Sequence, residues 1–200
     1  MSNFVTLGFG PASPTEFVDF WRRAYRTNVA TYNANIRVNQ SLRTANVVAL
    51  MRWKAGRFAD AAEQFARAIP VRYLNTCRKS NVPLSDNALR GLYDRITSAL
   101  RREDLARSEA IVWPIFLCHV AQPLSVPIYD RYVWRAWGFI TEWIEPRHYA
   151  QQPESFDTYL EYRLWFNSFV QSDGLDRQHF DQALMAFGQF LSNRWGGLLR

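Results

Sequence analysis

Apolar residues recur at helical spacing along almost the whole chain, and alternating strand patterns are nearly missing. Ser13, Pro14 and Glu16 form a capping box with proline at the first helical position, and Ser85 precedes another helical run. The fifth run contains Pro114, which must either kink that helix or restart it. An extended piece is expected only at 4–7. The pattern predicts an all-α protein with helices at about 14–24, 44–56, 58–69, 86–96, 108–120, 131–143, 156–170 and 177–191.

The chain shows no internal repeat and no low-complexity linker. Its 200 residues can bury one sizeable core or two small lobes. If there are two lobes, the proline-containing loops at 80–85 and 121–128 are the expected seams.

Aromatic residues make up 16% of the chain, and most of them sit on the predicted helical stripes. Those on the stripes are expected to be plain core: Phe17, Phe20, Phe65, Phe180 and Phe187. Five others lie off the stripes or near loops and are candidates for a surface role: Tyr32, Trp53, Tyr129, Tyr132 and Trp134. Each of these five is at least as compatible with core packing.

Composition narrows the class of protein. Hydrophobic residues at 48% and charged residues at 21% exclude a disordered chain. Two cysteines cannot build a disulfide framework, an iron–sulfur cluster or a four-cysteine zinc site, and three scattered histidines add no metal site. We expect no cofactor and no metal. Without a long apolar run or a signal-like N-terminus, a soluble cytoplasmic protein is predicted, with no sign of oligomerisation.

The net charge of +6 comes from 22 arginines and only two lysines, Lys54 and Lys79. Arginine forks match phosphate oxygens in pairs and stack on flat rings, so a basic, arginine-rich and aromatic-rich chain suits nucleic acid. A genome rich in GC would produce the same excess of arginine without any nucleic-acid partner. Composition alone leaves both explanations open.

A proline-rich loop delivers Asp130 to the predicted start of a helix in the segment PIYDRYVWRA. Aspartate is a preferred N-cap, so this position has a purely structural explanation. The helix N-terminus also stabilises a carboxylate, which suits Asp130 to stabilising a cation or activating water rather than to acting as an acid.

This segment resembles the catalytic segment of the helix-hairpin-helix DNA glycosylase superfamily, the group that contains endonuclease III. Pro127 precedes Asp130, and Val133 and Arg135 follow it as in the family motif. The stretch from 85 to 120 has the length and apolar spacing of the family's helix-hairpin-helix, and residues 121–143 would form the catalytic loop and helix. The resemblance implies one catalytic domain over 1–200, a two-lobed helical bundle whose second lobe is built from the N- and C-terminal helices.

Three departures from the family pattern stand in the sequence. The hairpin segment LRREDLAR has no glycine, Tyr132 replaces the histidine found two residues after the family's aspartate, and no cluster-binding cysteines follow. The hairpin is therefore degenerate, and side chains would have to replace the contacts that the hairpin's backbone amides make with a DNA phosphate in the family. These departures argue against oxidised pyrimidines and 8-oxoguanine as substrates.

The resemblance implies a set of roles. Asp130 would be catalytic, and a base turned out of the duplex would stack on aromatic faces. Family members that cut the backbone use a lysine near the hairpin, a position that neither lysine occupies here, so the resemblance implies a monofunctional enzyme. Lys54 is the possible exception, and His119 is a second candidate with core packing as its simpler explanation. The expected base pocket is Tyr32, Trp53, Tyr129, Tyr132 and Trp134, and the expected DNA contacts are Arg101, Arg102, Arg107, Arg131 and Arg135.

The whole chain is also similar to small bacterial glycosylase-like proteins of defence against phages with modified DNA. The runs WKAGR, FLCHV, PIYDRYVWRA and DQALMAFGQFL carry this similarity. It implies a bulky base such as glucosylated hydroxymethylcytosine in double-stranded DNA. Two other classes stay open: a DNA-binding module of the same fold without turnover, and a helical protein–protein adaptor whose charge is incidental.

Overall fold

The computed structural model describes residues 4, 12–36, 38, 40–56, 59–78, 83–105, 111–142 and 155–192, with the backbone alone for 59–62. Within this part of the chain every regular element is a helix, which confirms the all-α prediction. The chain divides into two compact units, one of 1–26 with 128–200 and the other of 27–127. One boundary therefore falls at the end of the predicted seam 121–128, whereas the segment 80–85 lies inside the second unit.

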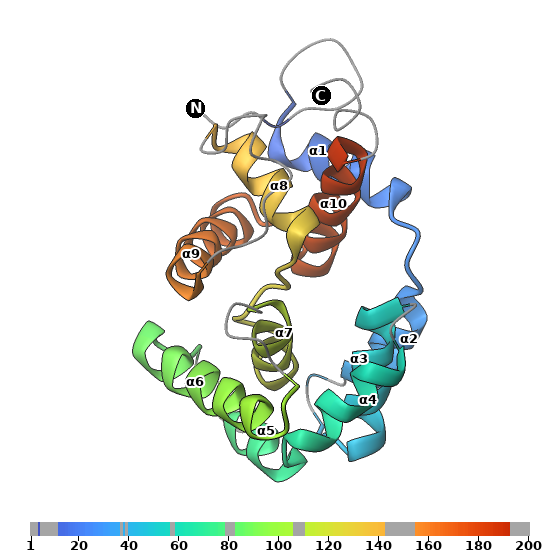
Figure 1. Ribbon diagram of the computed structural model, residues 1–200. Helices are drawn as coiled ribbons and strands as arrows, with labels where there is room; N and C mark the ends of the chain where they lie inside the picture. The colour runs from blue at the N-terminus through green and yellow to red at the C-terminus, as the bar shows by residue number, and fades with distance from the viewer. Residues whose placement is uncertain are drawn as a thin grey trace. The chain divides into compact units, whose positions relative to one another are not determined.

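The first unit contains four α-helices and a short 3-10 turn among its described residues. They are α1 (Pro14–Trp21), η1 (Arg22–Ala24), α8 (Arg131–Ile140), α9 (Phe156–Ser172) and α10 (Arg177–Phe190). Helix α10 packs on both α1 and α8, as Figure 1 shows. The approach of α8 to α10 depends on Gly188, because a Cβ there would lie 1.9 Å from the carbonyl oxygen of Tyr132.

Local signals set the ends of these helices. Ser13 accepts a hydrogen bond from the amide of Glu16 while Glu16 accepts one from the amide of Ser13, which is the predicted capping box. Asp176 caps α10 through the amide of His179 at 2.8 Å.

Phe20 was expected in the core but is 39% exposed, because the buried face of α1 carries Phe17, Val18 and Trp21 instead.

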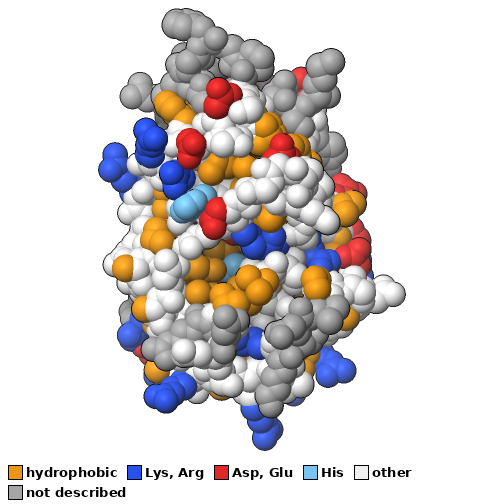
Figure 2. Space-filling view, turned by 180° about the vertical axis from the view of Figure 1, so that it is seen from behind, with side chains coloured by type: hydrophobic (Ala, Val, Ile, Leu, Met, Phe, Trp, Pro, Cys, Tyr) orange, Lys and Arg blue, Asp and Glu red, His pale blue; other side chains and the backbone are white. Residues whose placement is uncertain are grey.

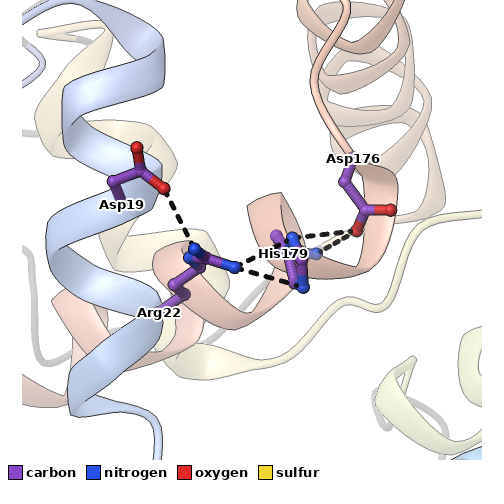
Figure 3. A network of polar contacts seen from close by, with 4 residues as sticks. All are labelled: Asp19, Arg22, Asp176 and His179. Atoms are coloured by element: carbon purple, nitrogen blue, oxygen red, sulfur yellow. Dashed lines mark hydrogen bonds and ion pairs between the residues drawn. The ribbon is translucent and has the colours of Figure 1, made fainter.

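A polar network ties the end of α1 to the start of α10 (Figure 3). Arg22 Nη2 lies 3.2 Å from an oxygen of Asp19, and its Nη1 lies 3.3 and 3.4 Å from the two ring nitrogens of His179. The ring Nδ1 of His179 is in turn 3.5 Å from Asp176 Oδ1. Because these side chains are partly exposed, the network orients the two helices more than it stabilises them.

The second unit contains the other six helices of the described chain. They are α2 (Val29–Ile36), α3 (Thr44–Ala55), α4 (Ala59–Ala68), α5 (Val71–Arg78), α6 (Asp86–Arg102) and α7 (Val112–Ala121). Helix α3 packs against α2 and α4, while α7 packs against α5 and α6. Every residue of α7 from Pro114 to Ala121 is buried, which makes it the core helix of this unit. Pro114 lies in the first turn of α7, where its missing N–H removes no intrahelical bond, and residues 108–110 of the expected helix lie outside the described residues.

Two helices of this unit, α2 and α5, were not expected from the sequence. Each buries a single residue through its whole length, Ile36 in α2 and Leu74 in α5. Polar side chains hold α5 instead: Asn75 exchanges two hydrogen bonds with the backbone of Leu42, at 2.8 and 2.9 Å. Arg78 donates to the carbonyls of Val120 and Ile36, both at 2.6 Å. Helix α3 begins at Thr44, and Arg43 is its N-cap.

Candidate functional site

Asp130 is the N-cap of α8, as the sequence indicates, and it is 7% exposed. Its Oδ1 accepts hydrogen bonds from the amides of Tyr132 at 2.8 Å and Val133 at 3.0 Å. Two amide donors and the positive end of the helix dipole both stabilise a negative charge on this carboxyl. The side chain is therefore held as an oriented anion at the first turn of α8.

The loop before Asp130 is built from hydrogen-bonded turns. The amides of Ser125 and Val126 both donate to the carbonyl of Gln122, at 3.2 and 3.0 Å. The side chain of Gln122 donates to the carbonyl of Cys77. Val126 and Pro127 are buried. The segment that leads to Asp130 thus has a fixed path at its start, which is a requirement for placing a reacting group.

Two of the expected pocket residues belong to the core of the first unit instead. Tyr129 is fully buried, with its ring 5.3 Å from that of Tyr159 and 5.1 Å from that of Tyr162. Trp134 is 4% exposed on the inner face of α8. Because Tyr129 is completely buried and Trp134 almost so, neither ring has an exposed face on which a base could stack.

The two arginines of α8 differ in exposure, and the exposed one contacts Tyr132. Arg131 is exposed, stacks over the ring of Tyr132 at 4.7 Å and donates to its hydroxyl at 2.7 Å. Arg135 is half-buried and donates to Ser192 Oγ. Burial, and secondarily the charge of Arg131, lowers the pKa of Arg135. Of the two guanidinium groups, that of Arg131 is the more accessible to a phosphate.

The turn after α6 replaces the glycine that the hairpin lacks. Asp104 has a φ of +55°, the left-handed conformation that glycine usually supplies after a helix. The amide of Leu105 bonds to the carbonyl of Leu100 at 2.9 Å, and that of Asp104 bonds to Arg101 at 3.0 Å. This is the Schellman pattern of a helix end. Aspartate tolerates the conformation better than most residues do, and it places a negative charge on the turn.

The arginines expected to contact DNA from the hairpin are only partly described. Arg101 and Arg102 are exposed in the last turn of α6, beside the exposed acids Glu103 and Asp104. Arg107 lies outside the described residues. On the face drawn in Figure 2, lysine and arginine side chains form several separate groups rather than one continuous patch.

The structure brings together four candidates from three distant parts of the sequence, all within the second unit. The hydroxyl of Tyr32 lies 2.7 Å from His119 Nε2, across 87 residues of sequence. The ring of Trp53 is 5.0 Å from that of Tyr32 and 6.1 Å from that of Phe116. Lys54 Nζ lies 5.8 Å from the centre of the Phe116 ring. We call Tyr32, Trp53, Phe116 and His119 the aromatic cluster.

Sequence reasoning missed three residues that the structure adds, two in or beside the aromatic cluster and one in the turn after α6. Phe116 stacks on His119 and Trp53, but on a helix with apolar residues all round it had no distinguishing signal. The carbonyl of Val126, 2.6 Å from His119 Nδ1, is a backbone group that no residue pattern reveals. Asp104 had a signal: an Asp following a charged helix end is one of the few non-glycine residues that favour the left-handed conformation.

No protein-family model, curated protein or solved structure matches this chain. No helix in the described part of the chain is long and apolar enough to cross a membrane. Among the described residues, no three His, Cys, Asp or Glu side chains are grouped as a metal site would require.

Proposed function

We propose that this protein is a monofunctional DNA glycosylase of the helix-hairpin-helix type, which excises a modified base and leaves an abasic site. The observation that carries the proposal is the Asp130 carboxylate, buried at the N-terminus of α8 and oriented by two amide donors. The ordering of α6, a left-handed turn, α7, a hydrogen-bonded loop and Asp130 along the chain adds support.

The chemistry asks for an oriented negative charge. When the bond between base and sugar breaks, the electron pair leaves with the base and the sugar becomes oxocarbenium-like, as in glycoside hydrolysis. A fixed carboxylate stabilises that cation without reorganising during the reaction. Water then adds to the sugar carbon and loses a proton, and the departing base takes up a proton. Asp130 supplies this negative charge.

The positions of the two lysines bear on whether the enzyme also cuts the DNA backbone. A lyase needs an amine that forms a Schiff base with the opened sugar. Neither lysine occupies the family's position near the hairpin: Lys54 packs near Phe116, and Lys79 lies outside the described residues. We therefore propose that neither amine takes part and that the strand stays intact. A bulky modified cytosine in phage DNA, such as glucosylated hydroxymethylcytosine, is the proposed substrate.

The test is base release from a panel of DNAs that includes phage DNA with glucosylated cytosine, with abasic sites revealed by alkali. Asp130→Asn keeps an oxygen that can accept from the two amides, so it removes the charge while retaining the cap. The matched control is Asp176→Asn, the same change at the N-cap of α10 in the same unit. Loss of alkali-dependent breaks in Asp130→Asn of about a hundredfold or more, with Asp176→Asn unchanged, is the expected result.

A second function, DNA binding without turnover, is favoured by the acidic turn. Glu103 and Asp104 follow Arg101 and Arg102 directly, so the tip of this hairpin carries no net charge among those four residues. Such a tip holds phosphate less tightly than a glycine turn with free amides. In the same assay a binding module releases no base before or after the change at Asp130. Breaks that appear without alkali would instead assign a lyase and direct attention to Lys54.

A further inference from the structure

The polar network of the first unit contains two local contacts and one contact that joins distant parts of the chain (Figure 3). The ion pair of Arg22 with Asp19 spans three residues, and that of His179 with Asp176 also spans three. Each of these two pairs therefore stays within its own stretch of chain. Arg22 and His179 are 157 residues apart, so their contact is the part of the network that links the N-terminal segment, α1 with η1, to α10.

The contact between Arg22 and His179 requires a neutral imidazole. Arg22 Nη1 lies 3.3 Å from Nδ1 and 3.4 Å from Nε2 of His179, and a guanidinium can only donate. A neutral imidazole always has one ring nitrogen that accepts, whichever tautomer is present. An imidazolium has none, and its positive charge repels the guanidinium. Protonation of His179 therefore breaks the contact.

The two local contacts remain when His179 is protonated. The Asp176 carboxylate lies 3.5 Å from Nδ1 and attracts a positively charged ring. Its Oδ1 also accepts from the amide of His179 at 2.8 Å, a bond that does not depend on the charge of the ring. Arg22 keeps its ion pair with Asp19 at 3.2 Å. Titration of the ring thus changes the link between the two parts of the chain and leaves the contacts within each part in place.

The surroundings of the ring allow it to respond to pH in the folded protein. Helices α1 and α8 and the turn η1 pack on α10. Among the described residues of these elements and of α10 itself, the charged groups that reach the ring are those of Arg22 and Asp176. The side chain of His179 is 43% exposed, so solvent reaches it without any opening of the fold. Histidine is the residue type whose charge changes most readily between pH 5 and 8.

We propose that His179 is a pH-sensitive link, which holds Arg22 and the N-terminal segment to α10 when the ring is neutral and releases them when it is protonated. The proposal goes beyond the proposed glycosylase and does not depend on it. Phe17 and Trp21 still pack on Phe187 in either state, so release loosens the segment without unfolding it. Because η1 ends two residues before the chain passes into the second unit, the link restrains the stretch of chain that leads there.

Amide hydrogen exchange of the whole protein at pH 7.5 and 5.5 tests the proposal. Protection factors are compared, because they remove the intrinsic effect of pH on exchange. We expect the protection of the amides in α1 and η1 to fall about fivefold at pH 5.5, the ratio that one net hydrogen bond supplies. The fall should follow the titration of the His179 ring, measured by nuclear magnetic resonance. The amides of α6, in the second unit, are the internal reference and should keep their protection.

Two substitutions separate the charge of the ring from its shape. His179→Gln supplies an uncharged oxygen that accepts from Arg22 at either pH, so its protection should match that of the unmodified protein at pH 7.5 under both conditions. His179→Phe keeps a ring without an acceptor, so its protection should be low under both conditions. Both variants keep the backbone amide that Asp176 caps. Circular dichroism checks that each variant is folded.

Two results would overturn the proposal. A fall in protection at pH 5.5 that persists in His179→Gln assigns the response to another titrating group. Equal protection of the unmodified protein at both pH values shows that the ring does not control the segment. Neither measurement involves base excision, so the failure of this proposal and the failure of the glycosylase are distinguishable.

Discussion

At the scale of single residues, two buried tyrosine hydroxyls in the core of the first unit lower the stability of the fold. Tyr129 and Tyr162 are fully buried, and neither hydroxyl has a hydrogen-bond partner among the described residues. An unsatisfied buried hydroxyl costs about 1–3 kcal/mol. Burial is also the main cause that raises the pKa of both phenols, because the ionised form would lie in an apolar environment.

We predict that Tyr162→Phe stabilises the protein, by about 1 kcal/mol at pH 7, because it removes the unpartnered hydroxyl and keeps the ring. The gain should grow above pH 10. There the phenol ionises in the unfolded chain but stays neutral in the fold, so the unmodified protein loses stability as the pH rises from about 10 towards the raised pKa. Urea unfolding midpoints at pH 7 and 10.5 measure both effects. A difference between the two proteins that is the same at both pH values contradicts the second.

At the scale of elements, helix α5 depends on polar side chains more than on apolar ones. Arg78 is half-buried, and its two terminal nitrogens reach the carbonyls of Ile36 at the end of α2 and Val120 near the end of α7. Carbonyls at helix C-termini lack intrahelical partners, so a cation there is favourable. One guanidinium thus joins the ends of three helices.

We predict that Arg78→Lys lowers the free energy of unfolding by about 2 kcal/mol, because a single ammonium cannot serve two carbonyls with the geometry of the planar fork. Arg72→Lys is the control, since Arg72 is exposed on the same helix. Its effect should stay within about 0.5 kcal/mol. Thermal unfolding of both variants by circular dichroism measures the difference. Equal midpoints would show that Arg78 contributes no more than a surface charge.

The difference between α5 and α6 explains how far the sequence predicts the helices. Ser85 and the buried stripe of α6 are local signals, because a cap and a period of 3.6 residues depend only on near neighbours. The same holds for Ser13 and Asp176. Helix α5 has one buried apolar residue, and its bonds run to residues more than thirty positions away. Periodicity cannot detect such an element.

The residues of the candidate site also separate into those with local sequence signals and those that depend on distant contacts. Asp130 was singled out from a cap, a proline and a spacing, all of which are local, and the structure confirms that it is the N-cap of α8, while its catalytic role stays a prediction. Tyr129 and Trp134 were expected in a pocket but pack in the core, because a loop or helix-start position does not reveal which side of the chain is covered. Tyr32 and His119 were singled out separately. Their pairing depends on how α2 meets α7, which the sequence leaves open.

At the scale of the whole molecule, the charge is carried by arginines that are spread over both units. The net charge is +6, with 22 arginines. Several are already engaged within the protein, including Arg78 with two carbonyls and Arg135 with Ser192. Only accessible guanidinium groups release counterions on binding DNA, so the net charge overstates the number of phosphate contacts. The salt dependence of binding measures that number directly.

We predict that affinity for a duplex falls steeply between 50 and 200 mM salt, and that changing Arg101 and Arg102 together to glutamine lowers the slope by about two contacts. The matched control changes Arg43 and Arg72, two exposed arginines of the same unit, to glutamine. Fluorescence anisotropy over a salt series gives both slopes. Equal slopes in the two double variants would remove the end of α6 from the DNA contact. Negligible affinity at low salt, where phosphate contacts are strongest, would refute both DNA proposals. Neither a glycosylase nor a DNA-binding module functions without contacts to the DNA backbone. The protein would then be a helical adaptor with incidental charge.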